Sequence, residues 1–300
     1  MTDSANPQLK IALLDIYANS LIVLDRLSGE IIYTLSEVGC PDGVQVDVAN
    51  GYFYWTDMGA HRIGEAFPDA DGRVLRCRLD GSERTVLVGD GAVYTPKQIH
   101  LDVQQQLLYW SDREGAKVMR CRVDGSGLVT LVKRGKSAVA PHSKLDECVG
   151  IAVDKVGGHI YWSQKGPAKG SQGRLFRAGI DIPAGEQAWN RSDIELLADH
   201  LPEPIDLEID EQNRLLYWTD RGMEPDGNSL NRATFGPAGL TGHEVLVRGF
   251  HDAIGLTLDK PRNKIFVADL SGQIVEIDLQ TLQSSVRYSA SKAVTGLSIF

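Results

Sequence analysis

The sequence predicts an all-β fold, a six-bladed β-propeller in which each blade is a sheet of four strands. Three observations lead to this prediction. A tetrapeptide recurs along the chain at a spacing of roughly 50 residues, short strands of alternating pattern flank each copy, and residues 294–300 match a strand that the first repeat lacks. Four short strands in a unit of about 40 to 55 residues are the signature of a propeller blade.

The tetrapeptide joins two aromatic residues to a hydroxyl residue and an acidic or amide residue. Its four strong copies are Tyr54–Asp57, Tyr109–Asp112, Tyr161–Gln164 and Tyr217–Asp220. A degenerate fifth copy is Phe266–Asp269, and the weakest copy, near the N-terminus, is Leu13–Ile16. The regular order of these copies indicates an internal repeat, with each copy on the same strand of its blade.

The residues around each copy supply the other three strands of the unit. Upstream, a short apolar strand ends in an aspartate, which is Asp47, Asp102, Asp154, Asp210 or Asp259. Downstream, alternating runs begin at Val74, Val118, Leu175 and Ile274, and further runs cover 84–88, 128–132, 194–198 and 243–247. Alternation of apolar and polar residues over such short runs is typical of half-buried β-strands.

The first and last segments of the chain complement each other. Residues 11–16 begin the first unit without an upstream strand, whereas residues 294–300 match the upstream strands but precede no tetrapeptide. We therefore predict that 294–300 form the innermost strand of the blade whose other strands lie within 11–35. This closure removes the exposed edges of an open array and gives one domain over residues 11–300, after a disordered N-terminus at 1–10.

Composition and charge restrict the classes of partner. The 300 residues include 31 basic and 40 acidic side chains, so the formal net charge is −9. Such a charge repels phosphate groups, so neither nucleic acid nor an anionic membrane is an expected partner. No apolar stretch reaches the ~18 residues that span a bilayer, and the four cysteines form no C-x-x-C pair. With no secretory signal in the sequence, the expected location is cytoplasmic.

With these repeats, the sequence resembles the YWTD β-propeller family, best known from the extracellular part of the low-density lipoprotein receptor. The resemblance covers residues 11–300, and Gln164 replaces the motif aspartate in the fourth blade. It implies that the motif lies on the second strand of each blade, with Tyr and Trp packed between neighbouring sheets. It also implies that the aspartate accepts backbone hydrogen bonds that tie blades together.

Long loops predict which face of the propeller carries a site. Loops 58–73, 165–174 and 221–232 follow motif strands, and 133–150 is the longest connection between two units. All four map to the face at one mouth of the central channel. Insertions that gather on one face of a repeat fold mark its functional face.

We expect the site residues among the polar side chains of these loops and of the inner strands. The candidates for catalysis by proton transfer are His61, His100 and His251, because histidine titrates nearest to neutral pH. The candidates for substrate binding are Arg62, Lys97 and Arg221 as oxygen ligands, Asp42 and Asp206 as the groups that orient them, and Tyr94 and Met223 as apolar wall. Neither a metal nor a cofactor is expected, since the sequence has no H-E-x-x-H motif and no P-loop.

As a free-standing, single-domain propeller of this size, the sequence resembles proteins that are encoded with fungal secondary-metabolite pathways. Among these are the hetero-Diels–Alderases, which join a tropolone-type o-quinone methide to a terpene alkene. The resemblance implies a cofactor-independent biosynthetic enzyme that binds a small-molecule substrate at the channel mouth. Two alternatives remain open: a protein-interaction scaffold that uses the same face, and a lactonase or other hydrolase with a metal ion in the channel.

Overall fold

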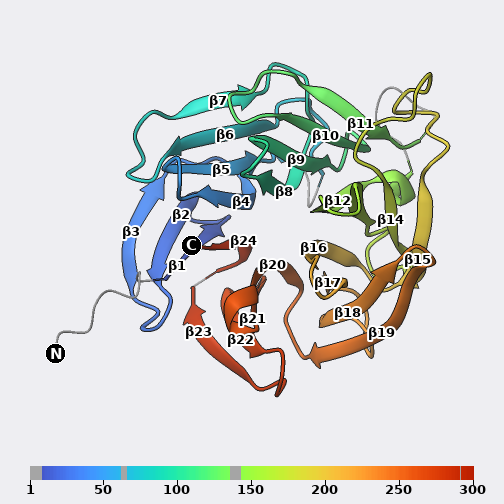
Figure 1. The fold of residues 1–300 in the computed structure, drawn as a ribbon. Coiled ribbons are helices and arrows are strands. Elements are labelled where there is room, and N and C mark those ends of the chain that lie inside the picture. Colours follow the sequence, from blue (N-terminus) through green and yellow to red (C-terminus); the bar gives the residue numbers. More distant parts are fainter. Residues whose placement is uncertain (1–8, 62–65, 136–142, 291) are drawn as a thin grey trace.

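The strands form a ring of six sheets around a central axis (Figure 1). The computed structural model describes residues 9–61, 66–135, 143–290 and 292–300, and within them twenty-four strands make six antiparallel sheets of four. The helices of this described part are two 3-10 turns, η1 (Lys144–Asp146) and η2 (Lys260–Arg262). None of its helices has the length and apolar character needed to cross a membrane. The predicted all-β, six-bladed propeller is confirmed.

Each blade runs from an inner strand at the axis to an outer strand at the rim. Blade 1 contains β24 (Val294–Ile299), β1 (Lys10–Asp15), β2 (Ser20–Asp25) and β3 (Ile31–Ser36); blade 2 contains β4 (Pro41–Asp47), β5 (Tyr52–Asp57), β6 (Arg73–Arg78) and β7 (Thr85–Val88). Blade 3 contains β8 (Pro96–Asp102), β9 (Leu107–Asp112), β10 (Lys117–Arg122) and β11 (Val129–Lys133); blade 4 contains β12 (Cys148–Asp154), β13 (His159–Gln164), β14 (Gly173–Gly179) and β15 (Glu195–Leu201). Blade 5 contains β16 (Pro204–Asp210), β17 (Leu215–Asp220), β18 (Ser229–Gly236) and β19 (Gly239–Arg248); blade 6 contains β20 (Ala253–Asp259), β21 (Lys264–Asp269), β22 (Gln273–Asp278) and β23 (Ser284–Ser289).

Blade 1 joins the two ends of the chain. Strand β24 pairs with β1 in antiparallel register, and Leu297 lies opposite Leu13. Lys10, the first residue of β1, and Phe300, which directly follows β24, exchange two backbone hydrogen bonds of 2.7 and 2.9 Å. The predicted closure by the C-terminal strand is therefore confirmed. Because β1 begins at Lys10, the predicted disordered segment 1–10 extends one residue into the sheet, and residues 1–8 lie outside the described residues.

The tetrapeptides occupy the second strand of their blades, as the family resemblance implied. The clear copies end their strands with the fourth residue, as Tyr54–Asp57 ends β5. In blade 1 the second strand ends at Asp15. The sixth copy is therefore Ala12–Asp15 and not the predicted Leu13–Ile16, because this weak copy has no aromatic residue to fix its register.

Most of the hydrophobic core of the described residues consists of six clusters, each between two neighbouring blades, and a seventh, smaller cluster joins blades 4, 5 and 6 at the channel. Trp55 of blade 2 lies in one cluster with Val23 of blade 1, whereas the adjacent Tyr54 lies in another with Trp110 of blade 3. Successive side chains of a strand point to opposite faces of the sheet, so one motif strand packs against both neighbouring blades. The implied packing of Tyr and Trp between sheets is confirmed.

Hydrogen bonds made by motif residues hold the inner strands in place around the channel. The hydroxyl of Thr56 donates to the Lys97 carbonyl of the next blade at 2.7 Å, and that of Ser163 donates to the Ile205 carbonyl at 2.6 Å. Asp57 accepts the Cys40 N–H at 2.8 Å, which anchors the connection from the preceding blade. The hydroxyl thus bonds the following blade directly, while the carboxylate holds the incoming chain.

Candidate functional site

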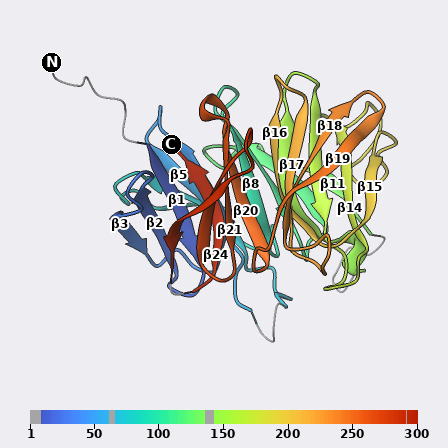
Figure 2. The same ribbon diagram turned by 90° about the horizontal axis from the view of Figure 1, so that it is seen from below.

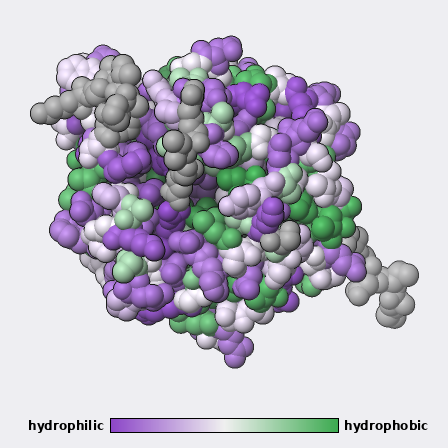
Figure 3. All heavy atoms as spheres, turned by 180° about the vertical axis from the view of Figure 1, so that it is seen from behind, coloured by the Kyte–Doolittle hydropathy of each residue, from purple (hydrophilic) through white to green (hydrophobic). Residues whose placement is uncertain are grey.

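A cavity of about 300 Å³ opens at one mouth of the central channel, and all six blades contribute to its lining. Residues of the β5–β6 and β13–β14 loops line it, so it lies on the face that carries the long loops. Figure 2 shows the β5–β6 loop and η1 projecting from the same side of the disc. Figure 3 looks onto this face, where hydrophobic and hydrophilic residues lie side by side around the centre. The hollowed face is the face predicted from loop lengths.

The outer part of the lining is a ring of six equivalent positions, each directly after the second strand of a blade. From blade 1 to blade 6 these positions are Ile16, Met58, Arg113, Lys165, Arg221 and Leu270. The members from blades 3, 4 and 5 are cationic, whereas those from blades 6, 1 and 2 are apolar. This outer ring therefore divides the mouth into a cationic half and an apolar half.

A second ring lies one step further into the channel and comes from the second residue of each inner strand. From blade 1 to blade 6 its members are Thr295, Asp42, Lys97, Val149, Ile205 and Ile254. In this inner ring the polar members belong to blades 1 to 3 and the apolar members to blades 4 to 6. The cations of blades 4 and 5 thus stand at the mouth beside apolar residues of the same blades.

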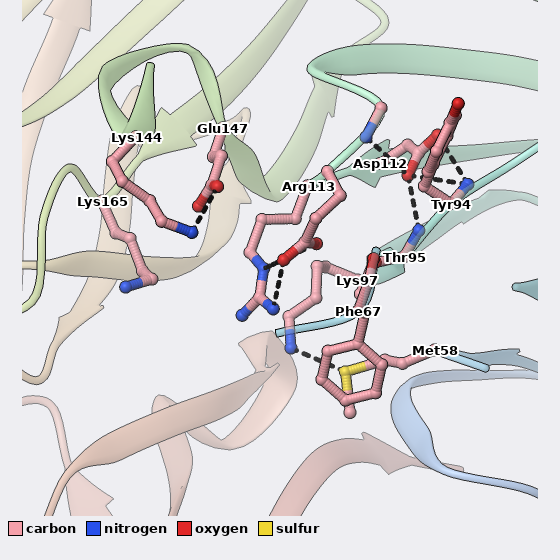
Figure 4. Close-up of polar contacts among 12 residues, drawn as sticks. Met58, Phe67, Tyr94, Thr95, Lys97, Asp112, Arg113, Lys144, Glu147 and Lys165 are labelled. Atoms are coloured by element: carbon pink, nitrogen blue, oxygen red, sulfur yellow. Dashed lines mark hydrogen bonds and ion pairs between the residues drawn. The ribbon is translucent and has the colours of Figure 1, made fainter. Parts of the chain in front are cut away.

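Lys97, the cationic member of the inner ring, is held in place by a buried carboxylate. Its Nζ lies 2.6 Å from Asp42 Oδ1, while Gln98 Nε2 donates to Asp42 Oδ2 at 3.0 Å. The same ammonium lies 3.0 Å from the sulfur of Met58, as Figure 4 shows. The Asp42 side chain is only 2% exposed. Both oxygens of this carboxylate are bonded, so the ammonium keeps a fixed place beside the apolar wall.

Arg113 points into the same space from blade 3 (Figure 4). Its guanidinium forms hydrogen bonds of 2.6 to 3.0 Å with the carboxylate of the adjacent Glu114. The guanidinium carbon also lies 5.5 Å from the centre of the Phe67 ring, within the range of a cation–π contact. Ion pairing and ring contact together orient Arg113 toward the cavity.

Glu203 connects the cations of blades 4 and 5. Its Oε2 accepts from Arg221 Nε at 3.1 Å and lies 3.7 Å from Lys165 Nζ. Its other oxygen accepts the backbone N–H of Lys169. The Glu203 side chain is 2% exposed and does not itself line the cavity. One buried carboxylate therefore positions two cationic side chains from neighbouring blades.

Comparison with known proteins identifies the family. A protein of Pyricularia oryzae named low-density lipoprotein receptor-related protein 1 is 42% identical over 270 residues, which are 86% of this chain and 84% of that protein. The chain belongs to the low-density lipoprotein receptor-related family of YWTD-type propellers. A protein of Cochliobolus heterostrophus named 3-hydroxyacyl-CoA dehydrogenase-like protein LAM1 is 38% identical over 289 residues, or 90% of this chain. The YWTD propeller spans only 58% of the length of that second relative.

A solved structure shares the fold of this YWTD propeller. A chain from the crystal structure of a nidogen/laminin complex superposes with a TM-score of 0.73, covering 97% of this chain and 98% of that chain at 18% identity. At this identity the likeness concerns the fold alone. No family model matches the sequence.

The structure of the YWTD propeller brings some of the predicted site residues together. Those that line the cavity are Asp42, His61, Lys97 and Arg221. The centre of the His61 ring lies 6.1 Å from that of Phe67. The predicted Arg62 lies outside the described residues.

Two further candidates lie deeper in the channel and do not line the cavity. His100 is three residues beyond Lys97 on β8, and burial lowers its pKa to about 4, so the imidazole is neutral at pH 7. Asp206 follows Ile205 on β16, and burial raises its pKa well above its usual range. Asp206 Oδ2 accepts the Leu256 N–H of blade 6 at 3.0 Å. Its carboxyl therefore bonds a neighbouring blade and not one of the cavity cations.

The remaining candidates are not among the residues that line the cavity. The His251 side chain is 72% exposed, with Nδ1 lying 3.8 Å from Asp269 Oδ2. Met223 is 51% exposed in the β17–β18 loop. Tyr94 precedes β8, and its backbone N–H donates to Asp112. The structure does not bring these three side chains into the cavity lining, because a loop's place on a face does not determine which way its side chains point.

Sequence reasoning missed several side chains of the cavity wall, among them two cations and one aromatic ring. Arg113, Lys165 and Phe67 line the cavity but were not among the predicted site residues. For the two cations a signal exists in the repeat, since the residue after each motif strand enters the outer ring. Phe67 has no such signal, because it lies inside a long loop without a counterpart in the other blades.

The cavity wall also contains a thiol. Cys40 lines the cavity, and burial raises its pKa to about 11, so the group is a protonated thiol at neutral pH. A protonated thiol is a poor nucleophile. We therefore assign Cys40 to the wall. Within the described residues, no group of three or more His, Cys, Asp or Glu side chains could hold a metal ion.

The carboxyl group of Glu208, in the inner strand of blade 5, is expected to make the stability of the fold depend on pH. Burial raises its pKa from 4.5 to about 7. Because the folded-state pKa lies above the unfolded value, this contribution to stability is complete below about pH 4.5 and is lost as the pH rises through about 7. Glu208→Gln is expected to raise the melting temperature at pH 8 but not at pH 4. Thermal unfolding at both pH values tests this, and an equal change at both would contradict it.

Proposed function

We propose that the channel mouth is the active site of a small-molecule enzyme that needs neither metal nor cofactor. The observation that carries this proposal is the split lining of the cavity. Met58, Phe67 and Ile254 offer apolar wall, while Lys97 and Arg113 present cations held by buried carboxylates. Pockets for small molecules typically combine a mostly apolar lining with a few fixed polar groups.

The candidate reaction is a hetero-Diels–Alder cycloaddition. In the first step a hydroxymethyl tropolone or phenol loses water: the C–O bond breaks, the leaving hydroxide takes up a proton, and the ring O–H gives up a proton, which yields the o-quinone methide. In the second step the oxygen and exocyclic carbon of this heterodiene add across an alkene, forming one C–O and one C–C bond. No oxidant or reductant is consumed.

The residues of the cavity can support both steps. His61 can donate a proton to the leaving hydroxyl group, which accelerates the loss of water. Lys97 and Arg113 can donate hydrogen bonds to the heterodiene oxygen, which withdraws electron density from the diene and fixes the face it presents. The apolar wall holds the alkene against the diene, and holding two reactants in a near-attack geometry lowers the entropic part of the barrier.

The names of the two relatives refer to different kinds of protein. One is named after a lipoprotein receptor, and the other after a dehydrogenase acting on acyl-CoA compounds. The second name comes from small-molecule metabolism and supports an enzyme over a docking scaffold. Because this chain spans 58% of that relative, the dehydrogenase activity in its name is not part of the proposal.

A direct assay tests the proposed reaction. The purified protein is incubated with a hydroxymethyl tropolone and a macrocyclic terpene alkene, and cycloadducts are separated by chiral chromatography. We expect faster formation than in buffer and an excess of one stereoisomer, since a chiral pocket fixes one face of the diene. Boiled protein is the control. A rate and stereoisomer ratio equal to the buffer reaction would contradict the proposal and favour the scaffold alternative.

A further inference from the structure

We infer that the ligand of this cavity is an amphipathic organic anion, with its acidic oxygen group between Lys165 and Arg221 and its hydrocarbon part on the apolar members of the inner ring. The inference rests on the proposed function, because it names the class of ligand for the same cavity. A carboxylate and the anion of an acidic enol, such as a tropolone, share the required chemistry: a planar group whose negative charge is spread over two oxygens.

The charge of the wall favours an anion. Among the described lining residues, four carry cationic groups and only one, Asp42, carries a carboxylate. The carboxylates of Glu114 and Glu203 hold the cations but do not line the cavity. A ligand at the mouth therefore meets ammonium and guanidinium groups first. An ammonium ligand would face like charges here, and a neutral ligand would accept hydrogen bonds from the cations but would form no ion pair with them.

The position of the charged group follows from Glu203. Its carboxylate holds Arg221 Nε at 3.1 Å and Lys165 Nζ at 3.7 Å, which brings two cations from adjacent blades to one place. The Lys165 and Arg221 side chains are only 7% and 14% exposed. Since long cationic side chains at a surface are usually mobile, fixing them in advance lowers the entropic cost of binding an anion. Glu203 is thus a positioning residue for a two-cation clamp.

The position of the hydrocarbon part follows from the inner ring. Val149, Ile205 and Ile254 form one apolar cluster, against which Leu270 packs. The carbonyl groups of Ile205 and Ile254 accept hydrogen bonds of 2.6 and 2.5 Å from motif hydroxyls, so the backbone of this surface is fixed. Ile205 lies two residues after Glu203, which places the apolar surface directly beside the clamp. A ligand that covers both must be charged at one end and apolar along its body.

Three probes of equal chain length test this inference. Octanoate, 1-octanol and octylammonium are titrated into the full chain by isothermal calorimetry at low ionic strength. We expect octanoate to bind at least about tenfold more tightly than octanol, because only the carboxylate forms ion pairs with the two cations. Octylammonium is expected to bind most weakly. Equal binding of octanoate and octanol, tighter binding of octylammonium, or no binding of octanoate would each overturn the inference.

A matched pair of variants locates the charged group. Arg221→Met is expected to weaken octanoate about tenfold and to leave octanol unchanged, whereas Arg248→Met should change neither. Arg248 is a suitable control because it lies on the same blade, pairs with the exposed Asp226 and does not line the cavity. Loss of octanoate preference in both variants, or in neither, would contradict the clamp. Melting temperatures of both variants show whether the fold is retained.

The failures of the two proposals can be told apart. A preference for octanoate without cycloaddition would keep the ligand class and remove the proposed reaction. Cycloaddition without a preference for octanoate would keep the reaction and remove the anion clamp, because a neutral heterodiene would then suffice as substrate.

Discussion

Deletion of residues 294–300 is expected to prevent the propeller from folding. The deletion removes β24, which pairs with β1 and also lies between β20 and β4 at the axis. It removes the buried side chains of Val294 and Leu297, each worth about 1.5–3 kcal/mol of burial. It also exposes the edge of β1 and opens the ring between blades 6 and 2. Because a domain is stable by only about 5–15 kcal/mol, these losses together are expected to exceed its stability.

A circular permutant provides the control for this deletion. Phe300 and Lys10 exchange backbone hydrogen bonds, so the end of β24 lies beside the start of β1. An Asn-Gly turn that joins residue 300 to residue 10, in a chain that begins at residue 292, restores the strand as a hairpin. We expect the permutant to show the native circular dichroism and a cooperative melting transition, and the deletion variant to show neither. A deletion variant that melts like the native chain would contradict the role assigned to β24.

The fold could be predicted because the repeat carries its own register. Trp55, Trp110 and Trp162 each sit between a tyrosine and a hydroxyl residue, and this pattern fixes both the strand and the faces of its side chains. The register failed only at Ala12–Asp15, where no aromatic residue marks the strand. Aromatic pairs contribute large buried areas, so their spacing reflects the packing of the blades more strongly than any single polar residue does.

The site could be predicted only in part, because a polar residue near the channel can point in several directions. Lys97 and Asp42 were found since the second position of an inner strand must face the axis. His251 precedes such a strand, yet its side chain turns to solvent. Arg113 and Lys165 were missed although they occupy the outer ring. Aligning the six repeats by the end of the motif strand would have placed both cations at the mouth.

Replacing His61 by alanine is expected to slow the proposed cycloaddition by about 10²-fold or more, because general acid catalysis of the loss of water typically contributes that much. His61 is exposed, and its ring contact is with Phe67, so the melting temperature should change by no more than a degree or two.

His251→Ala is the matched control for this substitution. His251 lies on the same face, but its side chain is 72% exposed and does not line the cavity, so this variant should keep the native rate. The measurement is single-turnover formation of the cycloadduct from the hydroxymethyl precursor. Supplying a pre-dehydrated o-quinone methide should restore the rate of His61→Ala, because only the first step needs the proton. If the two variants react equally fast, His61 takes no part in the reaction. If the pre-formed diene does not restore the rate of His61→Ala, proton transfer by His61 is the wrong mechanism, since its removal has then acted on the binding of the reactants.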